Sequence, residues 1–247
     1  MAATVVLGVI AYRPSVDSAE SAKKQTDVAA SEASRLPNLQ VMRTLAYLKD
    51  DLSGTYTYGL DKPEKQSGLR GPHIDVTFEN RANGPALITK ASLKFREMGH
   101  VETCGAVGGD LEISVNYDFP IPHPLPSVPY LTEKDISFQV GTNELDRLTL
   151  TTGPETVAGR PWYGVADVIL EHDGGKKQVV GPVALIDTGS DEHFYPDFDQ
   201  DRWVINVDDR ACLQRTADLT SRLLSTPGVI AAKELKSLRE TLNGLGY

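Results

Sequence analysis

The chain has 247 residues and a formal charge of −9 at pH 7, and 40% of its residues are hydrophobic and 24% charged. This composition is typical of a folded domain with enough length to bury a core, and it excludes an intrinsically disordered chain. The excess of acidic residues argues against a nucleic-acid partner, because nucleic-acid binding needs a basic face. Two cysteines are too few for a disulfide-rich scaffold or a four-cysteine zinc site.

An apolar run from Met1 to Tyr12 (MAATVVLGVIAY) ends at Arg13 and Pro14. A membrane-spanning helix needs about 20 apolar residues, and a secretory signal has a basic stretch before its apolar run. The run of residues 1–12 is shorter than a membrane-spanning helix, and it lacks the basic stretch of a secretory signal. Two interpretations stay open: a first strand or helix of the core, or the C-terminal half of an anchor that contacts a membrane.

Residues 15–36 contain no Pro or Gly and place small side chains three and four residues apart, which predicts a helix. The stripe consists of Ala19, Ala22, Thr26, Ala29, Ala33 and Leu36. Only one member is a large apolar residue, so the stripe favours a solvated stalk over a coiled coil. Residues 1–36 therefore form the first predicted segment. An apolar run that continues into a stalk slightly favours membrane association over a cytoplasmic location.

Between residues 38 and 187 the hydrophobic pattern alternates with a period of two, which indicates strands. Residues 87–96 are a clear example: Leu87, Ala91, Leu93 and Phe95 are expected on one face, and the polar Lys90, Ser92, Lys94 and Arg96 on the other. About eight short strands are expected, and no helical stretch of 10–15 residues lies between them. The pattern predicts a mainly β fold, an antiparallel β-sandwich with immunoglobulin-like architecture, over residues 37–205.

Two turns stand out within this domain. Asp173-Gly174-Gly175 separates two apolar stretches and predicts a β-hairpin. Residues 119–129 (FPIPHPLPSVP) contain five prolines, which a central strand does not tolerate. They are expected to form a crossover between sheets, and a polyproline ligand for a partner domain is the alternative.

Residues 206–247 predict a helical pair. Asp208 or Asp209 is placed to cap a helix that ends near Ser225, and residues 226–228 (TPG) break it. A second helix carries the stripe Ala231, Leu235, Leu238, Leu242 and Leu245. The pair either packs on the sandwich or provides a surface for oligomerisation or for a partner.

The sharpest motif spans residues 185–190 (LIDTGS), two apolar residues followed by D-T-G-S. It resembles the active-site loop of the aspartic proteases, and Asp191 and Glu192 resemble the retroviral-type continuation. The resemblance covers eight residues. It implies that Asp187 is one carboxylate of a dimeric dyad that shares a proton and activates water. The alternative is that D-T-G forms an ordinary turn at the end of a strand.

A second motif is the acidic stretch that contains Asp197, Asp199 and Asp201 at alternate positions. This spacing resembles the first half of a calcium loop, and Asp208 stands near the closing position. Arg202 occupies the place of the glycine that such a loop needs for its sharp turn. Calcium is the only cofactor that the sequence suggests, and a solvated acidic loop is the alternative.

The two cysteines and five histidines offer little further chemistry. Cys104 and Cys212 are candidates for a disulfide, which forms outside the cytoplasm. The alternative for Cys104 is a nucleophile near His100. The histidines are scattered without the spacing of a zinc site, and no phosphate-binding glycine loop or nucleophile elbow occurs.

These observations favour a non-enzymatic β-sandwich module, membrane-tethered or assembly-associated, with a binding or structural role. A protein partner or a second copy of the chain is the expected partner. The alternative is an aspartic-protease-like hydrolase that uses Asp187.

Overall fold

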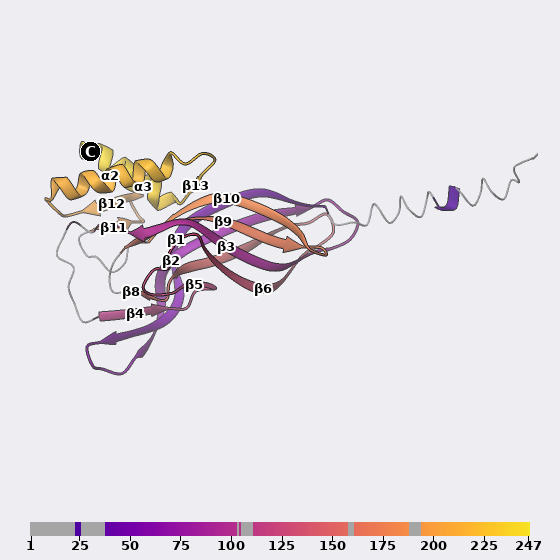
Figure 1. Cartoon of the computed structure of the whole chain (residues 1–247), viewed down its shortest axis with the longest axis horizontal. Coiled ribbons are helices and arrows are strands. Elements are labelled where there is room, and N and C mark those ends of the chain that lie inside the picture. The colour runs from indigo at the N-terminus through magenta and orange to yellow at the C-terminus, as the bar shows by residue number, and fades with distance from the viewer. Residues whose placement is uncertain (1–22, 26–37, 103, 105–110, 158–160, 188–193) are drawn as a thin grey trace, which may run out of the picture.

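The computed structural model describes residues 23–25, 38–102, 104, 111–157, 161–187 and 194–247. Of these residues 58% lie in strands and 16% in helices, and the sheets pack in a sandwich-like arrangement (Figure 1). The predicted mainly β sandwich is therefore confirmed. The apolar run and most of the expected stalk lie outside the described residues. Residues 23–25 of the expected stalk are described, and they are helical.

The first sheet has six described strands in the order β5-β7-β2-β1-β4-β8. They are β1 (Leu39–Tyr58), β2 (Glu64–Asn80), β4 (Leu111–Val115), β5 (Phe119–Ile121), β7 (Leu145–Pro154) and β8 (Thr156–Val157). The strands β1 and β2 form an antiparallel hairpin of 20 and 17 residues, far longer than the short strands expected. Register shifts such as that between Val41 and Arg43 interrupt the alternation of β1, which hides its length in the sequence.

The second sheet has five described strands in the order β13-β10-β9-β3-β6. They are β3 (Ala86–His100), β6 (Tyr130–Val140), β9 (Trp162–His172), β10 (Lys176–Ile186) and β13 (Ile230–Ala231). Lys176 pairs with His172, so β9 and β10 form the predicted hairpin. Asp173, Gly174 and Gly175 all have positive φ, as a tight turn of this kind requires.

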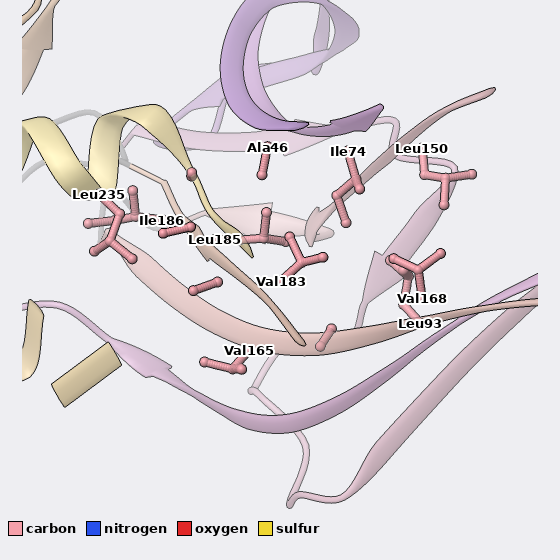
Figure 2. Close-up of a cluster of buried hydrophobic side chains, with 14 of the residues drawn as sticks. Ala46, Ile74, Leu93, Leu150, Val165, Val168, Val183, Leu185, Ile186 and Leu235 are labelled. Atoms are coloured by element: carbon pink, nitrogen blue, oxygen red, sulfur yellow. The ribbon is translucent and has the colours of Figure 1, made fainter. Parts of the chain in front are cut away.

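The core fills the space between the two sheets. Ile74 and Leu150 of the first sheet lie opposite Leu93 and Val168 of the second (Figure 2). All four are almost completely buried. Removal of each such side chain from water contributes about 2 kcal/mol, so the apolar layer between the sheets stabilises the sandwich.

The proline-rich segment connects the two sheets, as predicted. Its first residues form β5, a three-residue strand at the edge of the first sheet. The chain then crosses to β6 at the edge of the second sheet. Edge positions tolerate proline because one side of the strand needs no amide donors.

The helices α2 (Arg210–Leu224) and α3 (Lys233–Gly244) form the predicted pair. Asp209 accepts a hydrogen bond from the amide of Cys212 and caps α2. The buried leucines of both helices belong to the same core as the sheets, and β13 pairs in parallel with β10 between them. The pair thus packs on the sandwich. No helix in the described part of the chain is long and apolar enough to cross a membrane.

Candidate functional site

Asp187, the residue singled out by the D-T-G-S motif, lies just after β10 and is 3% exposed. Its amide donates to the carbonyl oxygen of Trp162 at 2.8 Å, and the Trp162 indole N–H donates to its Oδ2 at 3.2 Å. Asp187 therefore joins the end of β10 to the first residue of β9. The rest of the motif, residues 188–190, lies outside the described residues.

Tyr117 lies close enough to Asp187 for the two side chains to interact electrostatically. Burial raises the pKa of Tyr117 well above its ordinary value, and the charge of Asp187 raises it further. The ring fits over two glycines: a Cβ at Gly153 would lie 2.5 Å from its Cζ, and one at Gly71 would lie 2.7 Å from its Cε1. Among the described atoms its buried hydroxyl has no hydrogen-bond partner. Tyr117 closes a small apolar cluster apart from the main core, with Leu52 and Val115.

The acidic stretch forms a turn between β11 (Phe194–Asp197) and β12 (Arg202–Ile205). The Oδ1 of Asp197 accepts from the amides of Asp199, at 3.1 Å, and Gln200, at 3.2 Å. Asp201 pairs with Lys233 Nζ at 2.8 Å. In the part of the chain that the structure describes, no group of three or more His, Cys, Asp or Glu side chains is arranged to hold a metal. Two of the candidate calcium ligands thus cap the turn and tie it to α3.

Cys104 and Cys212 form a disulfide that joins positions 108 residues apart. A disulfide-bonded cysteine has no thiolate, so Cys104 is not a nucleophile in this state. Two ion pairs lie on the same helix: Arg215 with Glu102 and Arg222 with Glu97, each at 2.6 Å. The disulfide and these ion pairs fasten α2 to the end of β3 and the segment that follows it.

A polar cluster that the sequence analysis missed is centred on Asp75, which is 3% exposed. The Oδ2 of Asp75 accepts from Tyr47 Oη at 3.1 Å and lies 3.3 Å from an Arg147 guanidinium nitrogen. The Oδ1 accepts from Thr149 Oγ1 at 2.7 Å. The four side chains come from β1, β2 and β7. Buried charge is tolerated here because every oxygen of the carboxylate has a donor.

His73 extends this cluster along β2. Its Nε2 lies 2.9 Å from Asp51 Oδ1, and its Nδ1 lies 2.9 Å from the carbonyl oxygen of Gly71. Its ring stacks on that of Tyr47, with 5.4 Å between centroids. Burial, followed by the charge of Asp75, raises the pKa of Tyr47 to about 12. The hydrogen bond from Lys49 is the largest influence that lowers the pKa of Asp51, and His73 lowers it further.

These residues share one face of the six-stranded sheet, opposite the face that packs in the core, because cross-strand partners and alternate residues point the same way. We call it the polar face. Its members are Arg43, Leu45, Tyr47, His73, Asp75, Thr77, Arg147, Thr149 and Thr151. The alternation of His73, Asp75 and Thr77 in β2 was a usable signal, but only the strand register shows which side chains of β1 and β7 meet them.

A second exposed feature is the connecting end of β1 and β2, which extends past β4 on the side away from the helices (Figure 1). Leu60 is 106% exposed and Tyr58 is 60% exposed. The amide of Asp61 donates to the carbonyl oxygen of Tyr58 at 3.0 Å and closes the turn. Residues 54–56 pair with β2 on one side, and residues 54–58 pair with β4 on the other, so the turn projects from a three-stranded support.

Comparison with known proteins gives no match to a protein-family model, to a curated protein or to a solved structure.

Proposed function

We propose that the protein is a non-enzymatic binding module that contacts a protein partner through the connecting end of β1 and β2. The observation that carries this proposal is that Leu60 is completely exposed and that Tyr58, two residues before it, is largely exposed. An aliphatic and an aromatic side chain that are both exposed to water two residues apart are typical of an interface anchor that fills a pocket on a partner.

The character of this end favours a protein over a lipid surface. Asp61, Lys62, Glu64 and Lys65 follow Leu60 and their charges cancel, so there is no basic patch to attract anionic lipid. The three-stranded support fixes the turn before binding, which lowers the entropic cost of association.

The disulfide supports a location in an oxidising compartment, because cytoplasmic thiols are kept reduced. A module of this kind, tethered to a membrane through residues 1–12 or held in an assembly, would present its sandwich outside the cytoplasm. The proposed tether lies outside the described residues and rests on the sequence pattern alone.

The test places a photo-crosslinking amino acid at Leu60 in the full chain, in the cells that express it. The matched control carries the same group at Val179, which is exposed on the other sheet. We expect a discrete adduct from position 60 that disappears when Tyr58→Ser is added, and none from position 179. An adduct of twice the chain's mass identifies the partner as a second copy. Equal adducts from both positions, or none, would contradict the proposal.

The hydrolase alternative is tested on the same protein. Purified wild type is incubated with a broad peptide library at acid pH, and Asp187→Asn serves as the control. We expect no difference between the two. Cleavage by the wild type that the Asn variant lacks would overturn the non-enzymatic proposal, because it would assign the chemistry to that carboxylate.

A further inference from the structure

The polar face presents side chains in cross-strand rows. Arg43 and Arg147 flank Thr77 in one row, and Leu45 and Thr149 flank Asp75 in the next. Adjacent strands lie about 4.8 Å apart, so a row of three side chains spans about 10 Å. This width matches a sugar ring with its substituents.

Several members of this face remain open to solvent. The Arg147 side chain is 65% exposed, and Leu45 is 39% exposed. Arg43 and Thr149 are also exposed. A ligand that lies across the three strands can therefore reach groups from each of them.

The hydrogen-bonding groups are held in place before any ligand binds. Asp75 fixes the Tyr47 hydroxyl and the Thr149 hydroxyl, and it holds one nitrogen of Arg147. A guanidinium has five N–H donors, so Arg147 keeps donors for a ligand while its position is set by Asp75. Fixed donors and acceptors favour a ligand whose own groups are fixed, such as the ring hydroxyls of a sugar.

The face combines these polar groups with apolar surface. Leu45 lies two residues from Tyr47 on the same side of β1, and the Tyr47 ring is held by its stack on His73. Asp75 offsets the charge of Arg147, and Arg43 makes no ion pair with the described residues, so the two arginines and one carboxylate of the polar face carry a small net positive charge. A pyranose has C–H patches and hydroxyls that both donate and accept, and it complements this mixture.

We propose that the polar face is a saccharide-binding site. Arg43 and Arg147 donate to ring or exocyclic oxygens from either side of Thr77, the Thr149 hydroxyl accepts from a sugar hydroxyl, and Leu45 with Tyr47 contacts the C–H surface. Asp75 is a positioning residue that orients the other groups. This site is separate from the end of β1 and β2 that carries the proposed protein partner, and either proposal can fail without the other.

The probe is an array of immobilised neutral hexose, N-acetylhexosamine and uronate oligosaccharides, used with the full chain. The positives are followed by calorimetric titration with the free oligosaccharide. We expect one sugar class to bind, and Arg43→Ala and Arg147→Ala each to weaken binding about tenfold or more, the cost of one charge-assisted hydrogen bond. Lys94→Ala, an exposed cation on the other sheet, is the matched control and keeps the wild-type affinity.

Two controls separate recognition from misfolding. Arg43 makes no ion pair with the described residues, so Arg43→Ala is expected to keep the wild-type melting temperature. Arg147→Lys keeps the charge but not the planar fork and is expected to recover only part of the affinity. The proposal is overturned if no sugar on the array binds, or if binding is unchanged in both alanine variants, or if Lys94→Ala weakens it equally.

Discussion

The carboxylate of Glu234 in the first turn of α3 accepts a 3.0 Å hydrogen bond from the main-chain amide of Leu48 in β1. The two residues are 186 positions apart. Glu234 is 5% exposed, and burial is the main cause that raises its pKa above the ordinary value. The contact ties the C-terminal helices to the six-stranded sheet through a buried carboxylate.

This relationship predicts a pH-dependent difference between wild type and Glu234→Gln. A carboxyl whose pKa is raised by folding adds stability below its unfolded value of 4.5 and loses that contribution as the pH rises through the folded value. The glutamine keeps an acceptor for Leu48 without a buried charge. We therefore expect Glu234→Gln to gain stability relative to wild type as the pH rises from 4 to about 7. Urea unfolding across this range measures the difference.

The matched variant Glu234→Ala removes the acceptor. It leaves the Leu48 amide buried without a partner and is expected to be about 1–3 kcal/mol less stable than Glu234→Gln at every pH. If Gln and Ala lower stability equally at neutral pH, the hydrogen bond to Leu48 contributes nothing and the prediction is wrong.

Gly153→Ala is expected to destabilise the protein by about 1–3 kcal/mol, because its Cβ would overlap the buried ring of Tyr117. The ring also lies against Gly71, where a Cβ would come within 2.7 Å of its Cε1. Thermal unfolding of Gly153→Ala, Tyr117→Leu and the double variant forms a cycle. We expect the alanine to cost less in the Tyr117→Leu background. An equal cost in both backgrounds would show that the ring is not the obstacle.

Gly174→Ala is a control for backbone strain. Gly174 has a positive φ and open space around an added Cβ, so this substitution strains the backbone without any overlap.

Loss of the disulfide is expected to destabilise the protein by about 2–4 kcal/mol, because Cys104 and Cys212 close a long loop in the unfolded chain. Guanidinium unfolding of the Cys104→Ser, Cys212→Ser variant measures this cost. A dithiol reductant should lower the unfolding midpoint of wild type and leave that of the double variant unchanged. An identical response of the two proteins would mean that the bond does not contribute. The buried Leu213, Ala217 and Leu223 are expected to keep α2 packed on the sandwich in the variant.

The Asp75 cluster predicts an unusual tyrosine titration. The difference in ultraviolet absorbance between wild type and Tyr47→Phe isolates the phenol of Tyr47, which should ionise near pH 12. Its raised pKa contributes stability below pH 10 that is lost as the pH rises toward 12. In Asp75→Asn the pKa of Tyr47 should fall part of the way back toward 10, since the phenol remains buried. A phenol that titrates near 10 in wild type would contradict the burial of this cluster.

The hydrogen bonds of the same cluster should be coupled. Thr149→Val and Tyr47→Phe each remove one donor to Asp75 and are each expected to cost about 1 kcal/mol. The double variant leaves the carboxylate with Arg147 alone and should cost more than the sum. Strict additivity in denaturant unfolding would show that the two hydroxyls act independently.

Much of the fold could be predicted because its signals are local. The glycine turn at 173–175, the cap at Asp209 and the proline-rich crossover each depend on a few neighbouring residues, and the structure confirms them. The lengths of β1 and β2 were not predicted, because bulges break the alternation on which strand assignment depends. The polar cluster was missed for a related reason: its members are ordinary residues of three separate strands.

The sequence by itself determined the class of the fold, since alternation, turn residues and helix caps act over a few positions. Only the tertiary structure decided which strands pair and in which register, and a shift of one residue would turn Asp75 from the polar face into the core. Partners such as Tyr47 and Asp75, 28 residues apart, or Thr149 and Asp75, 74 apart, meet only after the sheet has formed. The candidate sites arise from these long-range pairings, whose energies depend on packing and burial rather than on local pattern.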